Sequence, residues 1–152
     1  MKAFKLLSLL LLSFGLFFSG CSHKKIGEPV KMHWDRDTCA RCHMLISDRH
    51  AAAEIINSDN GTAYKFDDFG CAISWLKEHQ PTWRNKAIIW IMNAKTEKWI
   101  DARKAYYTTG NTTPMAYGLL AYTKATIPKG KAAIDFEQAV KHVYLKNKTT
   151  NN

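Results

Sequence analysis

The apolar run from residue 6 to residue 18 constrains this chain most, because it decides in which compartment the rest of the sequence folds. The run follows a basic start and ends at Ser19-Gly20-Cys21, which is the pattern of a secretory signal. It is shorter than the ~20 apolar residues that a membrane-spanning helix needs. We therefore expect residues 1–20 to be a signal peptide and the remainder to fold outside the cytoplasm.

Cys21 is the expected anchor of the mature chain. Small residues directly before a cysteine resemble the lipobox of bacterial lipoproteins, although Phe18 stands where that pattern usually has Leu. The resemblance implies cleavage before Cys21 and lipid on its sulfur. Because Ser22 rather than Asp follows the cysteine, it also favours the periplasmic face of the outer membrane over the inner membrane.

The mature chain is long enough for one domain. Removing residues 1–20 from the 152 leaves 132, which supports a modest hydrophobic core. The removed part carries Lys2 and Lys5 and no acidic residue, so the net charge falls by two, from +9 to +7. The remaining basic residues are scattered rather than clustered, and the positive surplus favours contact with anionic lipid. An exported lipoprotein does not meet nucleic acid, so we expect no nucleic-acid partner.

Composition at the two ends sets the predicted domain boundaries. Residues 21–37 are polar and contain Gly27 and Pro29, which predicts a tether between lipid and domain. Asn and Lys dominate residues 146–152, which predicts a disordered tail over residues 147–152. The folded domain is then expected over residues 38–146.

Between these ends the hydrophobic period alternates between strand and helix. Two short strands are predicted at 52–56 and 61–66, around a turn. Next comes a helix, capped by Asp67 or Asp68, whose apolar stripe is Phe69, Ala72, Ile73 and Leu76.

Further along, strands are predicted at 87–92, 98–101 and 117–122, before a last helix that Asp135 caps. The apolar stripe of this second helix is Phe136, Ala139, Val140 and Val143. This order predicts a small single α+β domain with mainly antiparallel strands and two helices, arranged as two ββα-like units.

The cysteine count argues against a pure disulfide scaffold. If Cys21 carries lipid, Cys39, Cys42 and Cys71 remain. Oxidising compartments favour paired cysteines, but three is an odd number. At least one thiol is therefore free or serves as a ligand.

The densest group of metal-ligating side chains is Cys39-Ala40-Arg41-Cys42-His43-Met44. It offers two thiols, an imidazole and a thioether within six residues. Thiolate and thioether sulfur are soft ligands that favour Cu(I). The segment alone equally allows a disulfide between Cys39 and Cys42, with Met44 packed in the core.

Two further sulfur residues lie far along the chain. Cys71 falls near the start of the first predicted helix, where the helix N-terminus favours a thiolate, but a buried and inert thiol fits the position equally well. Met115 lies in a loop rich in Thr, Pro and Gly, which is an unusual place for a core methionine and gives weight to a ligand role.

Several motifs together resemble the NosL family of copper-delivering lipoproteins. They cover residues 35–140 and comprise Cys39-x-x-Cys42-x-Met44, Phe66-x-x-x-x-Cys71, Trp99-Ile100-Asp101-Ala102, Ala105-Tyr106-Tyr107 and Pro114-Met115-x-Tyr117-Gly118. The resemblance implies a small α+β domain that delivers Cu(I) during maturation of nitrous oxide reductase. Its implied partners are the apo-reductase and the ABC-transporter complex that serves its assembly.

The same resemblance assigns the metal ligands. The positions that match the family's pattern are Cys39, Cys42, Met44 and Met115, with His43 and Cys71 as additional candidates. Nothing in the sequence looks like a nucleophile–base pair or an activated-water site. We therefore expect a metal carrier rather than an enzyme.

His43 departs from the family and opens an alternative. Relatives usually have Gly at this position, and His43 creates Cys39-x-x-Cys42-His43, the signature of covalent c-type haem attachment. Met115 would then be available as the distal haem ligand. The strand-rich centre and the wide motif coverage favour copper over haem. Thiol–disulfide exchange ranks third, because the βαβ context of thioredoxin-like proteins is missing from the pattern.

Overall fold

A six-stranded sheet frames the structure, which is a computed structural model that describes residues 25–150. The strand order is β2-β1-β3-β6-β5, and β4 pairs with β3 off this path. Every pairing is antiparallel except that between β3 and β6. The strands are β1 (Ala53–Ile56), β2 (Ala63–Phe66), β3 (Ile88–Asn93), β4 (Lys98–Asp101), β5 (Tyr106–Thr108) and β6 (Leu120–Tyr122).

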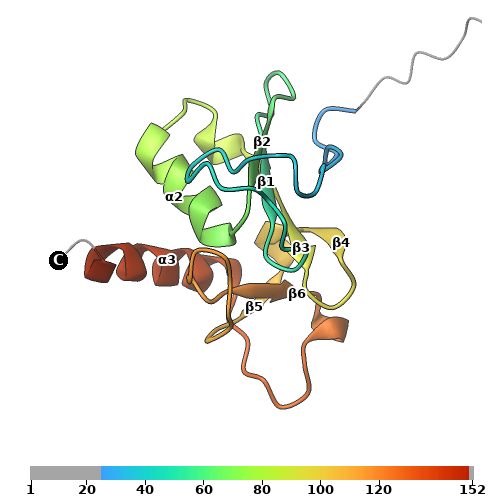
Figure 1. Cartoon of the computed structure of the whole chain (residues 1–152), viewed down its shortest axis with the longest axis vertical. Coiled ribbons are helices and arrows are strands. Elements are labelled where there is room, and N and C mark those ends of the chain that lie inside the picture. Colours follow the sequence, from blue (N-terminus) through green and yellow to red (C-terminus); the bar gives the residue numbers. More distant parts are fainter. Residues whose placement is uncertain (1–24, 151–152) are drawn as a thin grey trace, which may run out of the picture.

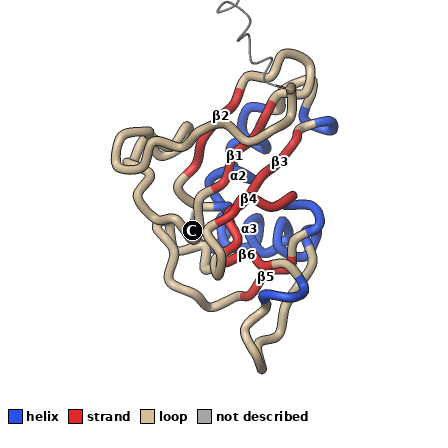
Figure 2. Tube along the Cα trace, turned by 90° about the vertical axis from the view of Figure 1, so that its right-hand side faces the viewer, coloured by secondary structure: helices blue, strands red, loops and turns tan. Residues whose placement is uncertain are grey.

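Two helices, α2 (Phe69–His79) and α3 (Phe136–Thr150), lie on the same side of this sheet (Figures 1 and 2). Each begins where an aspartate predicts it: the Gly70 N–H donates to Asp68, and the Gln138 N–H donates to Asp135. Among the described residues, three short 3-10 helices complete the secondary structure: η2 (Arg84–Lys86), η3 (Ala102–Lys104) and η4 (Lys124–Thr126). The predicted α+β class, with mainly antiparallel strands and two helices, is confirmed.

Aromatic rings fill the space between the sheet and the helices. Phe69 is fully buried, with its ring centroid 4.8 Å from that of Tyr107 and 6.0 Å from that of Phe136. Beside it, a Cβ on Gly70 would lie 1.9 Å from the ring of Tyr117. Only glycine therefore fits where the start of α2 packs against that ring.

The predicted tether is mostly part of the domain. The Trp90 indole donates to the Gly27 carbonyl at 2.8 Å, and the Val30 N–H donates to the buried Glu54 carboxylate at 3.0 Å. Met32 is only 6% exposed and belongs to the core. The folded domain thus begins near residue 27 rather than 38, because the backbone of this segment forms hydrogen bonds with side chains of the sheet.

The predicted disordered tail also needs correction, because α3 continues to Thr150. Asn147 holds its last turns in place: its carboxamide oxygen accepts from the Tyr117 hydroxyl at 2.7 Å, and its nitrogen donates to Ser74 at 2.8 Å. These tertiary hydrogen bonds outweigh the weak helix propensity of Asn and Thr in the local sequence.

Two details of the strand assignment differ from the sequence prediction. The strand predicted at 117–122 is shorter, since Gly118 has a φ of 76° and its N–H donates to Thr113 within a loop. The short strand β5 was not predicted, because its burial depends on pairing with β6 and on the isolated bridge from Tyr107 to Ile134.

The expected signal peptide and the lipidated Cys21 lie outside the described residues. Across residues 25–150, no helix combines the length and apolar character that crossing a bilayer requires.

Leu76→Ala tests the helical stripe. Leu76 is 7% exposed in α2, so its truncation should lower the free energy of unfolding by about 2–5 kcal/mol in a denaturant titration. Leu145→Ala is the matched control, because Leu145 is 54% exposed on α3 and its truncation should cost less than about 0.5 kcal/mol. Equal losses in the two variants would contradict the placement of α2.

Candidate metal centre

The Cys39–Cys42 segment forms the tip of a narrow hairpin. The Cys39 N–H donates to the Met44 carbonyl at 2.8 Å, and the His43 N–H donates back to the Cys39 carbonyl at 3.0 Å. Thr38 and Leu45 pair as an antiparallel bridge behind the tip. His43 closes this turn with a φ of 62°, a left-handed conformation that glycine adopts at lower cost.

The fold brings this hairpin against the start of α2. The Ala40 N–H donates to the Lys65 carbonyl of β2 at 2.8 Å. On the other side, Arg41 donates three hydrogen bonds of 2.7–3.1 Å to the Glu78 carboxylate of α2. The hairpin is therefore attached both to the sheet and to the helix that flanks the site.

Three thiols and one carboxylate converge at this junction. The ligand atoms of Cys39, Cys42, Asp67 and Cys71 all lie within 4.8 Å of one another. Cys39 and Cys71 are fully buried, Asp67 is 1% exposed, and Cys42 is partly exposed. We call these four residues the thiol cluster. All three sulfurs are thiols rather than members of a disulfide.

The three thiols of the cluster differ in pKa. A hydrogen bond from the Cys71 thiol lowers the pKa of Cys39, and backbone N–H groups of the hairpin and of Asp67 add to this effect. The same hydrogen bond, together with burial, raises the pKa of Cys71. Burial chiefly raises the pKa of Cys42. The contacts therefore favour the thiolate form at Cys39, and negative charge there raises the pKa of the neighbouring thiols.

Asp67 is the member that sequence reasoning missed. Burial, followed by the hydrogen bond with Cys39, raises its pKa to about 6. One of its oxygens accepts from the Cys42 thiol at 3.4 Å, and the other has no hydrogen-bond partner among the described residues. The available clue was the Asp67-Asp68 pair, since only one of two adjacent acids can cap a helix.

Asp68 is the cap, and it also secures the loop that carries Met115. The Thr113 hydroxyl donates to the Asp68 carboxylate at 2.6 Å, and the Met115 N–H donates to the same oxygen at 3.1 Å. The loop is therefore held at the helix end that carries Cys71. Met115 is partly buried and packs against the core.

The structure places the other predicted ligands at the surface of the same hairpin. Met44 is 49% exposed, and His43 is also exposed. The cysteines Cys39, Cys42 and Cys71 are brought together, as the copper hypothesis needs. Whether Met44, Met115 or His43 binds metal stays a prediction.

The two alternative interpretations of the CxxC segment fit this geometry poorly. Covalent haem attachment needs both thiols to reach the porphyrin edge, and Cys39 is fully buried. A thioredoxin-like site would place the CxxC pair at the start of a helix after a strand, whereas here it occupies a hairpin tip before β1.

Cys71→Ala should shift the thiolate titration of the reduced, metal-free protein. The wild type should show the ultraviolet absorbance of one thiolate well below the usual thiol pKa of ~8.5, because Cys71 donates to Cys39. Alanine has no proton to donate to the Cys39 sulfur, so the thiolate should appear at higher pH. Cys39→Ser should abolish the early thiolate, whereas identical titrations in all three proteins would contradict the shared-proton description.

His43→Gly should stabilise the hairpin. Relief of the left-handed strain is worth about 1–2 kcal/mol and is partly offset by the entropy of glycine, so the unfolding free energy should rise by up to about 1 kcal/mol. His50→Gly is the control, because exposed His50 lacks a positive φ and should lose stability. A loss of stability in His43→Gly equal to that of the control would show that the strain is absent.

Comparisons with known proteins agree with this architecture. No curated protein sequence gives a significant match to the chain. The solved structure of the copper chaperone NosL from Shewanella denitrificans is similar, with a TM-score of 0.58 and 16% sequence identity over 72% of this chain and 94% of that one. The sequence model of the NosL family matches residues 29–141, which is most of the chain. The chain therefore belongs to the NosL family.

Proposed function

We propose that this protein is a Cu(I) carrier that receives and releases the ion at the thiol cluster. The observation that carries the proposal is the convergence of three sulfurs within 4.8 Å at the buried start of α2. Soft sulfur ligands suit Cu(I), and the helix N-terminus stabilises negative sulfur. Family membership supports the same cargo, because the similar Shewanella protein is a copper chaperone.

The cluster is suited to the transfer of Cu(I) because its residues differ in solvent exposure. Cys39 and Cys71 are sealed from solvent, whereas Cys42 is partly exposed and Met44 lies at the surface. An incoming thiol or imidazole can therefore replace the outer ligands first. Binding of Cu(I) by Cys42 requires loss of its proton, and Asp67 accepts the hydrogen bond from that thiol. The protein holds and passes an ion without changing a covalent bond, so we do not propose an enzyme.

The presence of Asp67 raises the question of whether the cluster prefers Zn(II) or Cu(I). Three cysteines with one carboxylate match the four-coordinate ligand sets that bind zinc. Thioether sulfur is a poor zinc ligand but a good one for Cu(I), so participation of Met44 or Met115 favours copper. We propose that the methionines complete the site for copper and that Asp67 stays outside the first ligand sphere when copper is bound.

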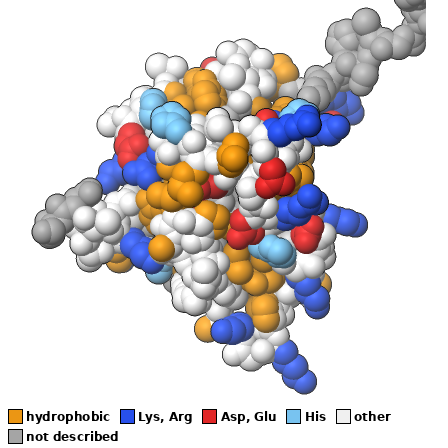
Figure 3. Space-filling model, viewed as in Figure 1, with side chains coloured by type: hydrophobic (Ala, Val, Ile, Leu, Met, Phe, Trp, Pro, Cys, Tyr) orange, Lys and Arg blue, Asp and Glu red, His pale blue; other side chains and the backbone are white. Residues whose placement is uncertain are grey.

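The proposed partners and location follow from family membership. The receiver of copper is apo nitrous oxide reductase, or the periplasmic part of its ABC-transporter assembly complex. The chain works at the periplasmic side of a membrane, anchored by lipid on Cys21, with the outer membrane favoured. Lys and Arg side chains are spread over the visible face rather than gathered in one patch (Figure 3), which agrees with a protein partner rather than nucleic acid.

Met115→Leu provides the test of the two-part site. The swap keeps volume and apolarity, so stability should change by less than about 1.5 kcal/mol. Cu(I) affinity of the reduced protein, measured by competition with a chelator, should nevertheless fall at least about fivefold. Met92→Leu is the matched control, since Met92 is buried in β3 and its swap should leave affinity unchanged.

The cysteine variants and a zinc titration complete this experiment. Cys39→Ser or Cys42→Ser should abolish tight Cu(I) binding, whereas Asp67→Asn should weaken Zn(II) binding more than Cu(I) binding. If Zn(II) displaced Cu(I) from the wild type, the copper proposal would fail. If Cu(I) bound tightly but Met115→Leu had no effect, the ion would sit on the thiols without the Met115 loop.

A further inference from the structure

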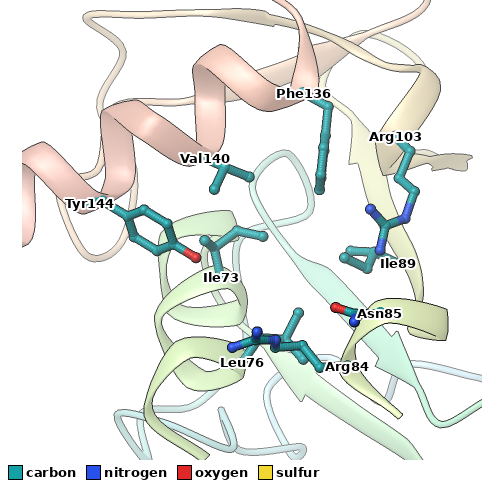
Figure 4. Close-up of a pocket in the computed structure, with 9 residues that line it drawn as sticks. All are labelled: Ile73, Leu76, Arg84, Asn85, Ile89, Arg103, Phe136, Val140 and Tyr144. Atoms are coloured by element: carbon teal, nitrogen blue, oxygen red, sulfur yellow. The ribbon is translucent and has the colours of Figure 1, made fainter. Parts of the chain in front are cut away.

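A separate pocket opens between α2 and α3, away from the thiol cluster (Figure 4). Its volume is about 350 Å³, within the range of ~300–1,000 Å³ typical of small-molecule sites. Apolar side chains from both helices and from β3 form its inner surface: Ile73, Leu76, Ile89, Phe136 and Val140. The copper proposal makes no use of this space.

Two arginines stand at the same pocket, and no acidic residue lines it. Arg84 comes from η2, on the side of the cavity opposite α3, whereas Arg103 comes from η3 and lies near Phe136 at the start of α3 (Figure 4). Within residues 25–150, neither guanidinium forms an ion pair with a carboxylate. Arg103 lies 5.2 Å from the centre of the Phe136 ring and donates to the Ala87 carbonyl at 3.3 Å.

Three hydrogen-bonding side chains at the rim make no hydrogen bond within the described part of the chain. The side chains of Arg84, Asn85 and Tyr144 have no hydrogen-bond partner among the described residues. Guanidinium groups bind carboxylates through paired, charge-assisted hydrogen bonds. A net charge of +2 beside an apolar cavity is therefore complementary to an anion that carries an apolar body.

We propose that this pocket binds an amphipathic carboxylate of the medium-chain fatty-acid class. The alkyl chain occupies the apolar space between α2 and α3, and Arg84 holds the carboxylate at the rim, with Arg103 adding a second positive charge to the same pocket. Burial of the alkyl chain contributes to the binding free energy through the hydrophobic effect, while the positively charged arginines favour a ligand with a negative charge. This site is independent of copper, because none of its lining residues belongs to the thiol cluster.

Titration of the whole mature, reduced protein with decanoate, below its micelle concentration, tests the proposal. The methyl signals of Ile73, Ile89 and Val140 should shift together in NMR spectra and saturate at one ligand per protein. Decanol, which has the chain without the charge, should bind at least about fivefold more weakly. Equal binding of decanol and decanoate, or no saturable shift with decanoate, would overturn the proposal.

Two variants fix the location. Arg84→Gln should weaken decanoate binding at least about fivefold, whereas Arg36→Gln, which removes the same charge from an exposed position outside the pocket, should not. Val140→Phe should block the cavity and reduce binding further. Cu(I) affinity should be normal in all three, which shows that they fold and separates a failure here from failure of the copper proposal. Binding that survives both pocket variants would place the ligand elsewhere and refute the site.

Discussion

The buried carboxylate of Asp68 is the contact on which the candidate site depends. One of its oxygens caps α2 through the Gly70 N–H, and the other accepts from Thr113 and from the Met115 N–H. Burial raises the pKa of Asp68, and these hydrogen bonds act in the opposite direction by favouring the charged form. A single side chain thus fixes where the helix begins and where the Met115 loop lies. Two stretches 47 residues apart in sequence meet because both satisfy the same group.

Around this point, the hairpin and the helix supply complementary parts of the thiol cluster. The hairpin brings backbone N–H groups that favour a thiolate on Cys39, and the helix brings the Cys71 thiol that donates to it. Arg41 joins the two through Glu78 and also lies 3.4 Å from the Tyr117 hydroxyl. These contacts hold the hairpin and the helix next to each other, which limits the conformational freedom that the ligands lose on binding an ion.

The sequence predicted those features that local pattern controls. The helical stripe ending at Leu76, the aspartate caps and the central strands all follow from spacing and capping chemistry, and the structure has them. The pattern did not predict that Asp67 lies among the thiols, since a capping role explained the acid pair adequately. It likewise missed β5 and the packing of Met32, because both depend on partners far away in sequence. Local reasoning fails where tertiary contacts decide the outcome.

The early start of the domain has a consequence for how the proposed lipoprotein would sit on a membrane. With folding from about residue 27, only residues 21–26 would separate the lipidated Cys21 from Gly27, which the Trp90 indole holds at the sheet. Six residues span at most about 20 Å when fully extended. A tether of 17 residues, as the composition suggested, would reach almost three times as far. The shorter tether would keep the domain close to the lipid headgroups, so that a partner must collect copper at the membrane surface rather than deep in the periplasm.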